Sequence, residues 1–118
     1  MNYGEVTDFK QMQYQVFIEE FQKDYNTDWS VINEKIKKML RNTFIAVATK
    51  YPEMHNDNSR AVYGIDIMID AETMEPKLLE ITFSPDCKRA CEYYPSFYDD
   101  VFHSLYLETM SENMERII

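Results

Sequence analysis

Apolar side chains alternate with polar or small ones along two stretches of this chain, residues 63–69 and 78–83. A period of two is typical of strands that bury one face, because successive side chains point to opposite sides. The intervening sequence AETMEP suits a hairpin loop. We therefore predict an antiparallel hairpin. Its apolar residues occupy odd positions, namely Tyr63, Ile65, Ile67 and Ile69, then Leu79, Ile81 and Phe83.

The register of this hairpin follows from the same alternation. Both apolar sets must face one core. In an antiparallel pair the residue numbers of facing partners add up to a constant, and because both apolar sets lie at odd positions this sum must be even. A turn centred near Thr73 satisfies this condition. The resulting pairs are Ile65 with Ile81, Ile67 with Leu79, Asp66 with Glu80, and Gly64 with Thr82.

Two carboxylates, Asp66 and Glu80, thus face each other across the strands. Facing residues have Cβ atoms about 4.5–5.5 Å apart, where like charges repel. A shared proton, a nearby cation or a metal ion would offset the repulsion. Magnesium takes one or two protein carboxylates and therefore suits the pair. The alternative is two solvent-facing carboxylates on an open sheet face, and a register slip of two residues would separate them.

Three helices are predicted around the hairpin, which makes the fold class α+β. The first covers 15–24, and the second runs from Trp29 to Lys50 with Asp28 as its N-cap. Ser96 and Asp99 resemble a capping box that opens the third, with Phe97, Val101, Phe102 and Leu105 inside. We expect 51–60 and 84–94 to be loops and 111–118 to be frayed or weakly docked.

Charge and glycine content exclude several classes of function. Lys and Arg total 12 against 21 Asp and Glu, a net charge of −9, which argues against nucleic acid or an anionic membrane as a direct partner. The cations Lys35, Lys37, Lys38 and Arg41 are interpreted as a solvated helix face. The chain has only two glycines, Gly4 and Gly64, and cannot build a glycine-rich phosphate loop.

The cysteines and histidines make a weak case for a metal. A closed zinc site would need Cys87, Cys91, His55 and His103 to converge. Reduced, partly buried thiols are the expectation, as in a cytosolic protein, although a disulfide within the loop stays open. The start MNYGEVTDFK has no signal-peptide core and no apolar run reaches the length of a membrane span, so we expect a cytoplasmic location.

The hairpin sequences GIDIMID and LLEITFSPDC resemble the end of the ATP-grasp module in the tubulin–tyrosine ligase-like family. SPDCKRAC and YYPSFYDDVF are the most specific parts of the resemblance, which extends from about Met1 to Leu107. It implies that residues 1–118 are the C-terminal portion of an ATP-grasp fold, an incomplete domain whose remainder lies upstream.

The resemblance also implies a cofactor and its ligands. In the family, an Asp on the first strand and Glu-x-Asn on the second hold the magnesium ions of ATP. Asp66 matches the first ligand and Glu80 the second, whereas Thr82 stands at the Asn position. A Thr hydroxyl is shorter than an Asn carboxamide and a weaker donor to a cation. The lysines that bind ATP lie upstream in the family, and no catalytic nucleophile or general base is identified here.

Three functions are compatible with these residues. The favoured one is a ligase-like protein with weak or absent ligase activity that binds tubulin, in the cytoplasm or at the cytoskeleton. An active ATP-dependent amino-acid ligase and a small non-catalytic interaction domain are the alternatives. Acidic tubulin tails should be repelled by a chain of net charge −9. Arg60, Lys88 and Arg89 are expected to neutralise the carboxylate pair or to contact phosphate.

Overall fold

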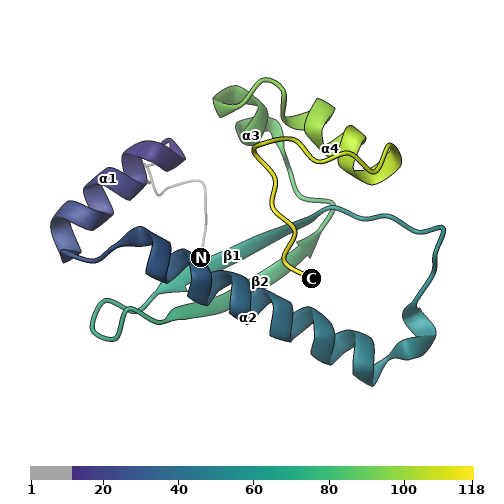
Figure 1. The fold of residues 1–118 in the computed structure, drawn as a ribbon, viewed down its shortest axis with the longest axis horizontal. Coiled ribbons are helices and arrows are strands. Elements are labelled where there is room, and N and C mark those ends of the chain that lie inside the picture. The colour runs from purple at the N-terminus through teal and green to yellow at the C-terminus, as the bar shows by residue number, and fades with distance from the viewer. Residues whose placement is uncertain (1–11) are drawn as a thin grey trace, which may run out of the picture. The chain divides into compact units, whose positions relative to one another are not determined.

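The computed structural model describes residues 12–118 and divides the chain into two units, 1–31 and 32–118. Gly4 and the residues examined for a signal peptide lie outside the described part. Along the chain the elements are α1 (Tyr14–Tyr25), α2 (Trp29–Lys50), the short 3₁₀ helix η2 (Pro52–Met54), β1 (Tyr63–Ile69), β2 (Pro76–Phe83), α3 (Lys88–Tyr93) and α4 (Phe97–Tyr106) (Figure 1). The α+β class is confirmed, with four α-helices within residues 12–118 instead of three.

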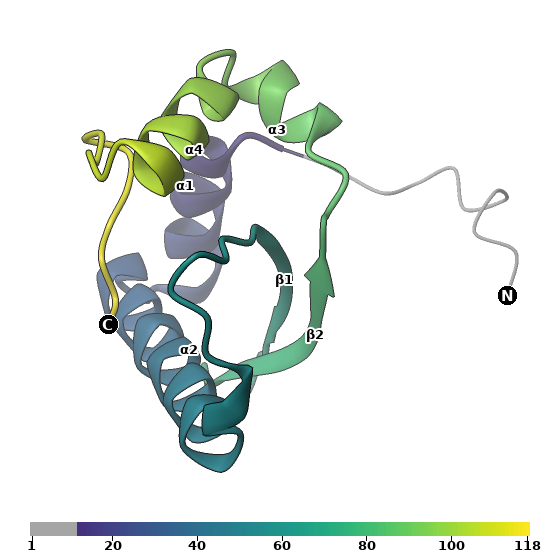
Figure 2. The same cartoon turned by 90° about the vertical axis from the view of Figure 1, so that its right-hand side faces the viewer.

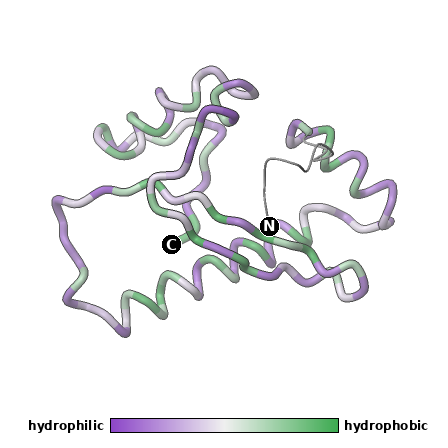
Figure 3. The backbone as a smooth tube through the Cα atoms, turned by 180° about the vertical axis from the view of Figure 1, so that it is seen from behind, coloured by the Kyte–Doolittle hydropathy of each residue, from purple (hydrophilic) through white to green (hydrophobic). Residues whose placement is uncertain are grey.

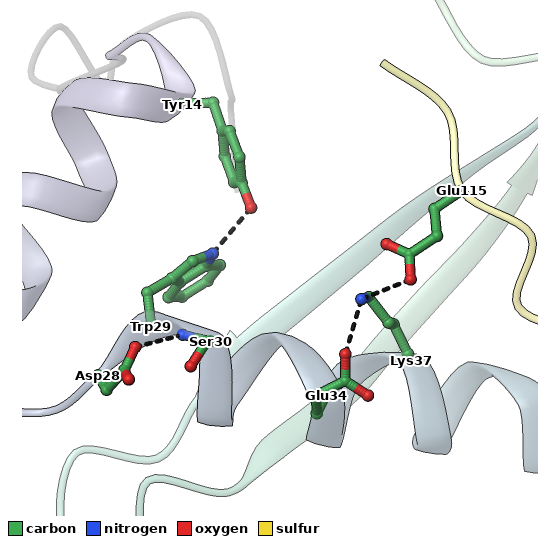
Figure 4. A network of polar contacts seen from close by, with 7 residues as sticks. All are labelled: Tyr14, Asp28, Trp29, Ser30, Glu34, Lys37 and Glu115. Carbon is green, nitrogen blue, oxygen red and sulfur yellow. Dashed lines mark hydrogen bonds and ion pairs between the residues drawn. The ribbon is translucent and has the colours of Figure 1, made fainter. Parts of the chain in front are cut away.

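Aromatic packing organises the first unit at the junction of α1 and α2. The Trp29 ring lies edge-on to the rings of Phe17 and Phe21, with centroids 5.1 and 5.4 Å away. Its indole N–H donates to the Tyr14 hydroxyl at 2.8 Å (Figure 4). Asp28 caps α2 as predicted, because its carboxylate accepts the backbone N–H of Ser30 at 2.8 Å. That hydrogen bond lowers the pKa of Asp28.

In the second unit, α2 runs along one side of the hairpin (Figure 1 and Figure 2). The ring of Phe44 lies 6.2 Å from that of Tyr63, which joins the helix to the odd-numbered face of β1. Figure 3 shows hydrophobic stretches along α2 that alternate with hydrophilic ones, as expected for a helix with one packed face. Among the described residues only Phe21 and Ile32 are buried apolar side chains, 7% and 1% exposed, so the core is small.

The hairpin is antiparallel as predicted, but its register changes within the strands. Asp66 pairs with Glu80, Gly64 with Thr82 and Ile65 with Ile81, in agreement with the sequence. The predicted pair of Ile67 with Leu79 is wrong, because Ile67 pairs with Leu78. Leu79 is the extra residue of a β-bulge, so Leu78 turns inward and Leu79 is 58% exposed. Phe83 is also exposed, contrary to the prediction.

Two predictions about the segment after the hairpin also need correction. The expected loop 84–94 contains α3, a helix of six residues. Ser96 precedes α4 but makes no side-chain capping bond, so the proposed capping box does not form. Within α4, Phe102 is exposed, whereas Phe97, Val101 and Leu105 are half-buried. Residues 107–118 contain no helix or strand, which includes the segment 111–118 that the sequence predicted to be frayed or weakly docked. Within residues 12–118, no helix combines the length and apolarity needed to cross a membrane.

Asp70 closes the hairpin turn through its side chain. Its carboxylate accepts the backbone N–H groups of Glu72 and Thr73 at 3.0 and 2.9 Å. These bonds, chiefly those from Thr73, lower the pKa of Asp70 below its ordinary 3.8. A lowered pKa means that the ionised form stabilises the folded state.

The turn should therefore loosen in acid. The contribution of Asp70 is present above pH 3.8, its ordinary pKa, and is lost as the pH falls through the lower pKa of the folded state. Asp70→Asn should remove this pH dependence, because an amide does not titrate. The Thr73 amide chemical shift, followed by NMR from pH 6 to about pH 2, measures the effect. An unchanged titration in Asp70→Asn would contradict it.

Gly64 is required by a close approach of the chain. A Cβ atom at this position would lie 2.8 Å from Cβ of Pro85, well inside van der Waals contact. Gly64→Ala should therefore destabilise the protein by about 1–3 kcal/mol, measured by chemical unfolding. In a Pro85→Gly background the same substitution should cost much less. Equal costs in both backgrounds would show that the contact with Pro85 is not responsible.

Candidate functional site

The candidate site lies on the even-numbered face of the hairpin. Gly64 and Asp66 on β1 alternate with the odd-numbered residues, one of which, Tyr63, meets α2. Their partners Thr82 and Glu80 on β2 share their face, since residues paired across strands point to the same side. Asp66, Glu80 and Thr82 are all exposed. The structure thus brings together the three residues that the sequence selected.

The β-bulge lies immediately beside the carboxylate pair. The register shifts between Asp66 and Ile67, one residue past the pairing of Asp66 with Glu80. A bulge adds local twist to its strand and changes the direction of nearby side chains. Here it leaves Leu79 and Glu80 exposed next to each other. The adjacent leucines of KLLEI interrupt the alternation, and this was the sequence signal for the bulge.

Thr82 is engaged with the pair through a hydrogen bond. Its hydroxyl donates to Oε1 of Glu80 at 2.7 Å, along the same strand. This bond offsets part of the negative charge that the two carboxylates concentrate at one place. Among the described residues no ion pair joins Asp66 or Glu80 to a cation. Both groups are exposed, so water and salt screen their repulsion.

The expected cations are placed elsewhere. The Arg60 guanidinium donates to the carbonyl oxygens of Asp57 and Ser59 at 2.7 and 2.9 Å, within its own loop. Lys88 and Arg89 begin α3, where they line a hollow of about 290 Å³ together with Asp86 and Glu92. Within residues 12–118 none of the three forms an ion pair with Asp66 or Glu80, so direct neutralisation of the pair is not seen, and contact with phosphate stays a prediction.

The segment that follows β2 folds back over the site. Ser84 adopts the left-handed conformation with φ 52°, and Pro85 then lies against Gly64 on the carboxylate face. A glycine within a strand was the available sequence signal for this close approach. Asp86 accepts the backbone N–H of Lys88 at 2.9 Å and so helps to start α3.

The cysteines are reduced and do not form a metal centre. Cys87 and Cys91 are free thiols of intermediate exposure. Within residues 12–118 no group of three or more His, Cys, Asp and Glu side chains is placed to hold an ion, so the four potential zinc ligands do not converge. Electrostatic interaction with Cys87, then burial and Cys91, raise the pKa of Tyr98 in the first turn of α4.

Carboxylate oxygens suit a hard cation such as magnesium, which is satisfied by one or two of them. Asp66 and Glu80 fit this requirement, because they are paired and exposed on one face. Thr82 fits less well, because a neutral hydroxyl is a weaker donor to a cation than a carboxylate or a carboxamide oxygen. The arrangement can hold one divalent ion through two carboxylates, with water or a phosphate filling the remaining positions.

Repulsion within the pair can be measured directly. Asp66→Asn should raise the free energy of unfolding by about 0.2–1 kcal/mol in low salt and without divalent ions, because it removes one of two facing charges. The gain should shrink at high salt. Thermal and chemical unfolding give the values. Glu72→Gln, which removes an exposed charge in the hairpin turn, is the matched control. A loss of stability in Asp66→Asn would contradict a repulsive pair.

Comparisons with known proteins identify a family that the chain resembles over nearly its whole length. A family model described as "Tubulin-tyrosine ligase family" matches residues 2–117. The Mus musculus protein named "Tubulin--tyrosine ligase-like protein 12" is 39% identical to this chain, and the match covers 100% of this chain and 20% of that protein. The Homo sapiens protein of the same name is 34% identical, and the match covers 92% of this chain and 18% of that protein. The Caenorhabditis elegans protein of that name is 39% identical over 91% of this chain and 17% of its own. The chain thus spans about a fifth of these relatives' length. No solved structure matches it significantly.

Proposed function

The chain belongs to the tubulin–tyrosine ligase family, and from this we propose that it forms the metal-holding hairpin of an ATP-grasp module with weak or absent ligase activity. The protein would then act on tubulin modification mainly by binding, in the cytoplasm or at the cytoskeleton. The observation that carries the proposal is the face shared by Asp66, Glu80 and Thr82, in which both carboxylates of the expected metal site are kept and its third ligand is altered.

The retained part of the site supports nucleotide-linked metal binding. Asp66 and Glu80 would hold magnesium, which supplies charge neutralisation of the ATP phosphates when it is bound. The two carboxylates need no rearrangement of the backbone to meet one ion, because the hairpin already pairs their Cα atoms. An unbroken register could equally have formed this pair, so the bulge is not what creates it.

The altered part of the site supports weak activity. Thr82 stands where the resemblance places an Asn, whose longer carboxamide oxygen reaches a cation more readily. The Thr82 hydroxyl is directed to Glu80 instead, at 2.7 Å. Phosphoryl transfer with two metal ions depends on ligands for both. Loss of one oxygen ligand would leave one of these ions poorly held.

Exposed apolar surface supports a role within a larger protein. Tyr63, Met68, Leu79 and Phe83 on the hairpin are between 46% and 66% exposed. Isolated two-stranded sheets are marginally stable in water, and three or more strands or further packing are needed. We propose that the remainder of a longer ligase-like protein covers these side chains and supplies the lysines that bind ATP. Binding to tubulin would use surfaces other than the acidic exterior of this segment.

The alternative of an active ligase draws on the same carboxylates. In the family reaction, ATP phosphorylates a carboxylate, and the amine of an amino acid then displaces phosphate to form an amide. Asp66 and Glu80 would act as metal ligands, and the groups that position the substrates would come from other parts of the protein. A purely non-catalytic interaction domain is the third possibility, and it predicts no effect of Asp66 or Glu80 on ATP binding.

Calorimetry of magnesium–ATP binding to the full-length protein tests the proposal. Wild type should bind weakly, and Thr82→Asn should strengthen binding about tenfold, because an amide oxygen replaces the hydroxyl. Thr82→Ser keeps a hydroxyl at this position and should leave the affinity unchanged.

Two results would contradict the proposal in different ways. Tight binding by wild type together with addition of tyrosine or glutamate to tubulin would establish an active ligase. No change in affinity when Asp66→Asn is combined with Glu80→Gln would favour the interaction domain.

A further inference from the structure

The C-terminal segment, residues 108–118, returns to α2 after leaving α4 (Figure 1). It contains no helix or strand, so it does not hold its shape through backbone pairing. Two contacts fix its last part to the helix. Oε1 of Glu115 lies 2.7 Å from Nζ of Lys37, and Nε of Arg41 donates to the carbonyl oxygen of Ile117 (Figure 4).

Lys37 is largely shielded from solvent and has two carboxylate partners. Its side chain is only 17% exposed, and its ammonium group also bonds to Glu34 at 2.7 Å. Hydrogen bonds to Glu115 and then Glu34 raise the pKa of Lys37. Lys37 belongs to a basic stripe on α2, which consists of Lys35, Lys37, Lys38 and Arg41. The stripe therefore does more than face solvent, contrary to the interpretation from sequence.

The spacing of the two contacts matches an extended peptide. Lys37 and Arg41 are four residues apart on a helix, a rise of about 6 Å. Glu115 and Ile117 are two residues apart, and an extended chain advances about 6.6 Å over two residues. One turn of α2 is thus in register with an extended segment that offers a carboxylate and, two residues later, a backbone carbonyl. Only the carboxylate depends on the sequence of the bound segment.

The C-terminal segment makes a further polar contact with the residues that precede α4, and a hollow lies beside it. Asn113 donates to the Tyr94 hydroxyl at 2.6 Å. A hollow of about 660 Å³ separates the segment from α4 and is lined by Arg60, Ser104, Leu105, Met110, Met114 and other residues. No side chain of residues 108–118 is buried, so the segment gains little from apolar burial. It can be displaced without opening a core.

We propose that Lys37 and Arg41 form a docking site for an extended peptide that offers a carboxylate and, two residues later, a backbone carbonyl, a site that residues 115–117 occupy from within the same chain. An acidic segment of a partner protein would displace them by offering its own carboxylate to Lys37. The site is separate from the carboxylate face of the hairpin and does not depend on metal binding there.

The charge of the chain is compatible with such a partner. The net charge is −9, but four of the 12 cations lie within the seven residues 35–41. At physiological salt the Debye length is about 8 Å, so distant carboxylates are largely screened at the stripe. Lys35 already pairs with Glu75 in the hairpin turn. Lys37, Lys38 and Arg41 are the cations of the stripe that an incoming peptide would meet.

Fluorescence anisotropy with a labelled peptide of residues 111–118, SENMERII, tests the proposal on the full-length protein. Glu115→Gln weakens the internal competitor and should increase peptide affinity about two- to fivefold over wild type. Glu112→Gln removes the same charge from the same segment but has no ion pair among the described residues, so it should have no effect. A labelled peptide with Gln in place of its second Glu should bind more weakly to every variant.

Substitutions on the helix identify the binding groups. In the Glu115→Gln background, Lys37→Gln should abolish the gain in affinity, whereas Lys38→Gln, one residue away, should largely retain it. Circular dichroism shows whether each variant is folded. Equal peptide binding by wild type and Glu115→Gln would overturn the proposal. Equal affinity for the Glu and Gln peptides would also overturn it, without requiring any substitution in the protein.

Discussion

The antiparallel pairing of β1 with β2 is the constraint on which the rest of the second unit depends. Up to Asp66 and Glu80 the strands keep one register, and beyond them the bulge at Leu79 shifts it by one residue. Because each one-residue shift moves side chains to the other face, the bulge turns Leu78 inward and Leu79 outward. The carboxylate pair is thus fixed by main-chain hydrogen bonds and not by attraction between its side chains, which repel each other.

The helix α2 connects distant parts of the chain through its charged residues. Lys35 bonds to the hairpin turn at Met74 and Glu75, while Lys37 and Arg41 hold the C-terminal segment. Each of these contacts joins residues that are at least 39 positions apart in sequence. A solvated basic face would leave such residues free, so the positive charge of α2 has a structural use in an otherwise acidic protein.

The core of this chain is small, and much apolar surface stays exposed. Within residues 12–118 the buried apolar side chains are limited to Phe21 and Ile32, and large apolar side chains remain exposed on the hairpin and on α4. Apolar patches of this kind mark surfaces that pack against other parts of a protein. This chain spans about a fifth of the length of its relatives, and under the proposed function the remainder of such a protein would cover these surfaces.

The sequence by itself determined the local structure. Periodicity located α1, α2, α4 and both strands, Asp28 marked the start of α2, and alternation placed Asp66 opposite Glu80. These features depend on residues close in sequence or on one face pattern. Tertiary structure alone decided that Pro85 contacts Gly64, that none of the expected cations forms an ion pair with the two carboxylates within residues 12–118, and that Glu115 reaches Lys37. Such contacts depend on where the chain turns back in space, and neither periodicity nor capping residues encode that path.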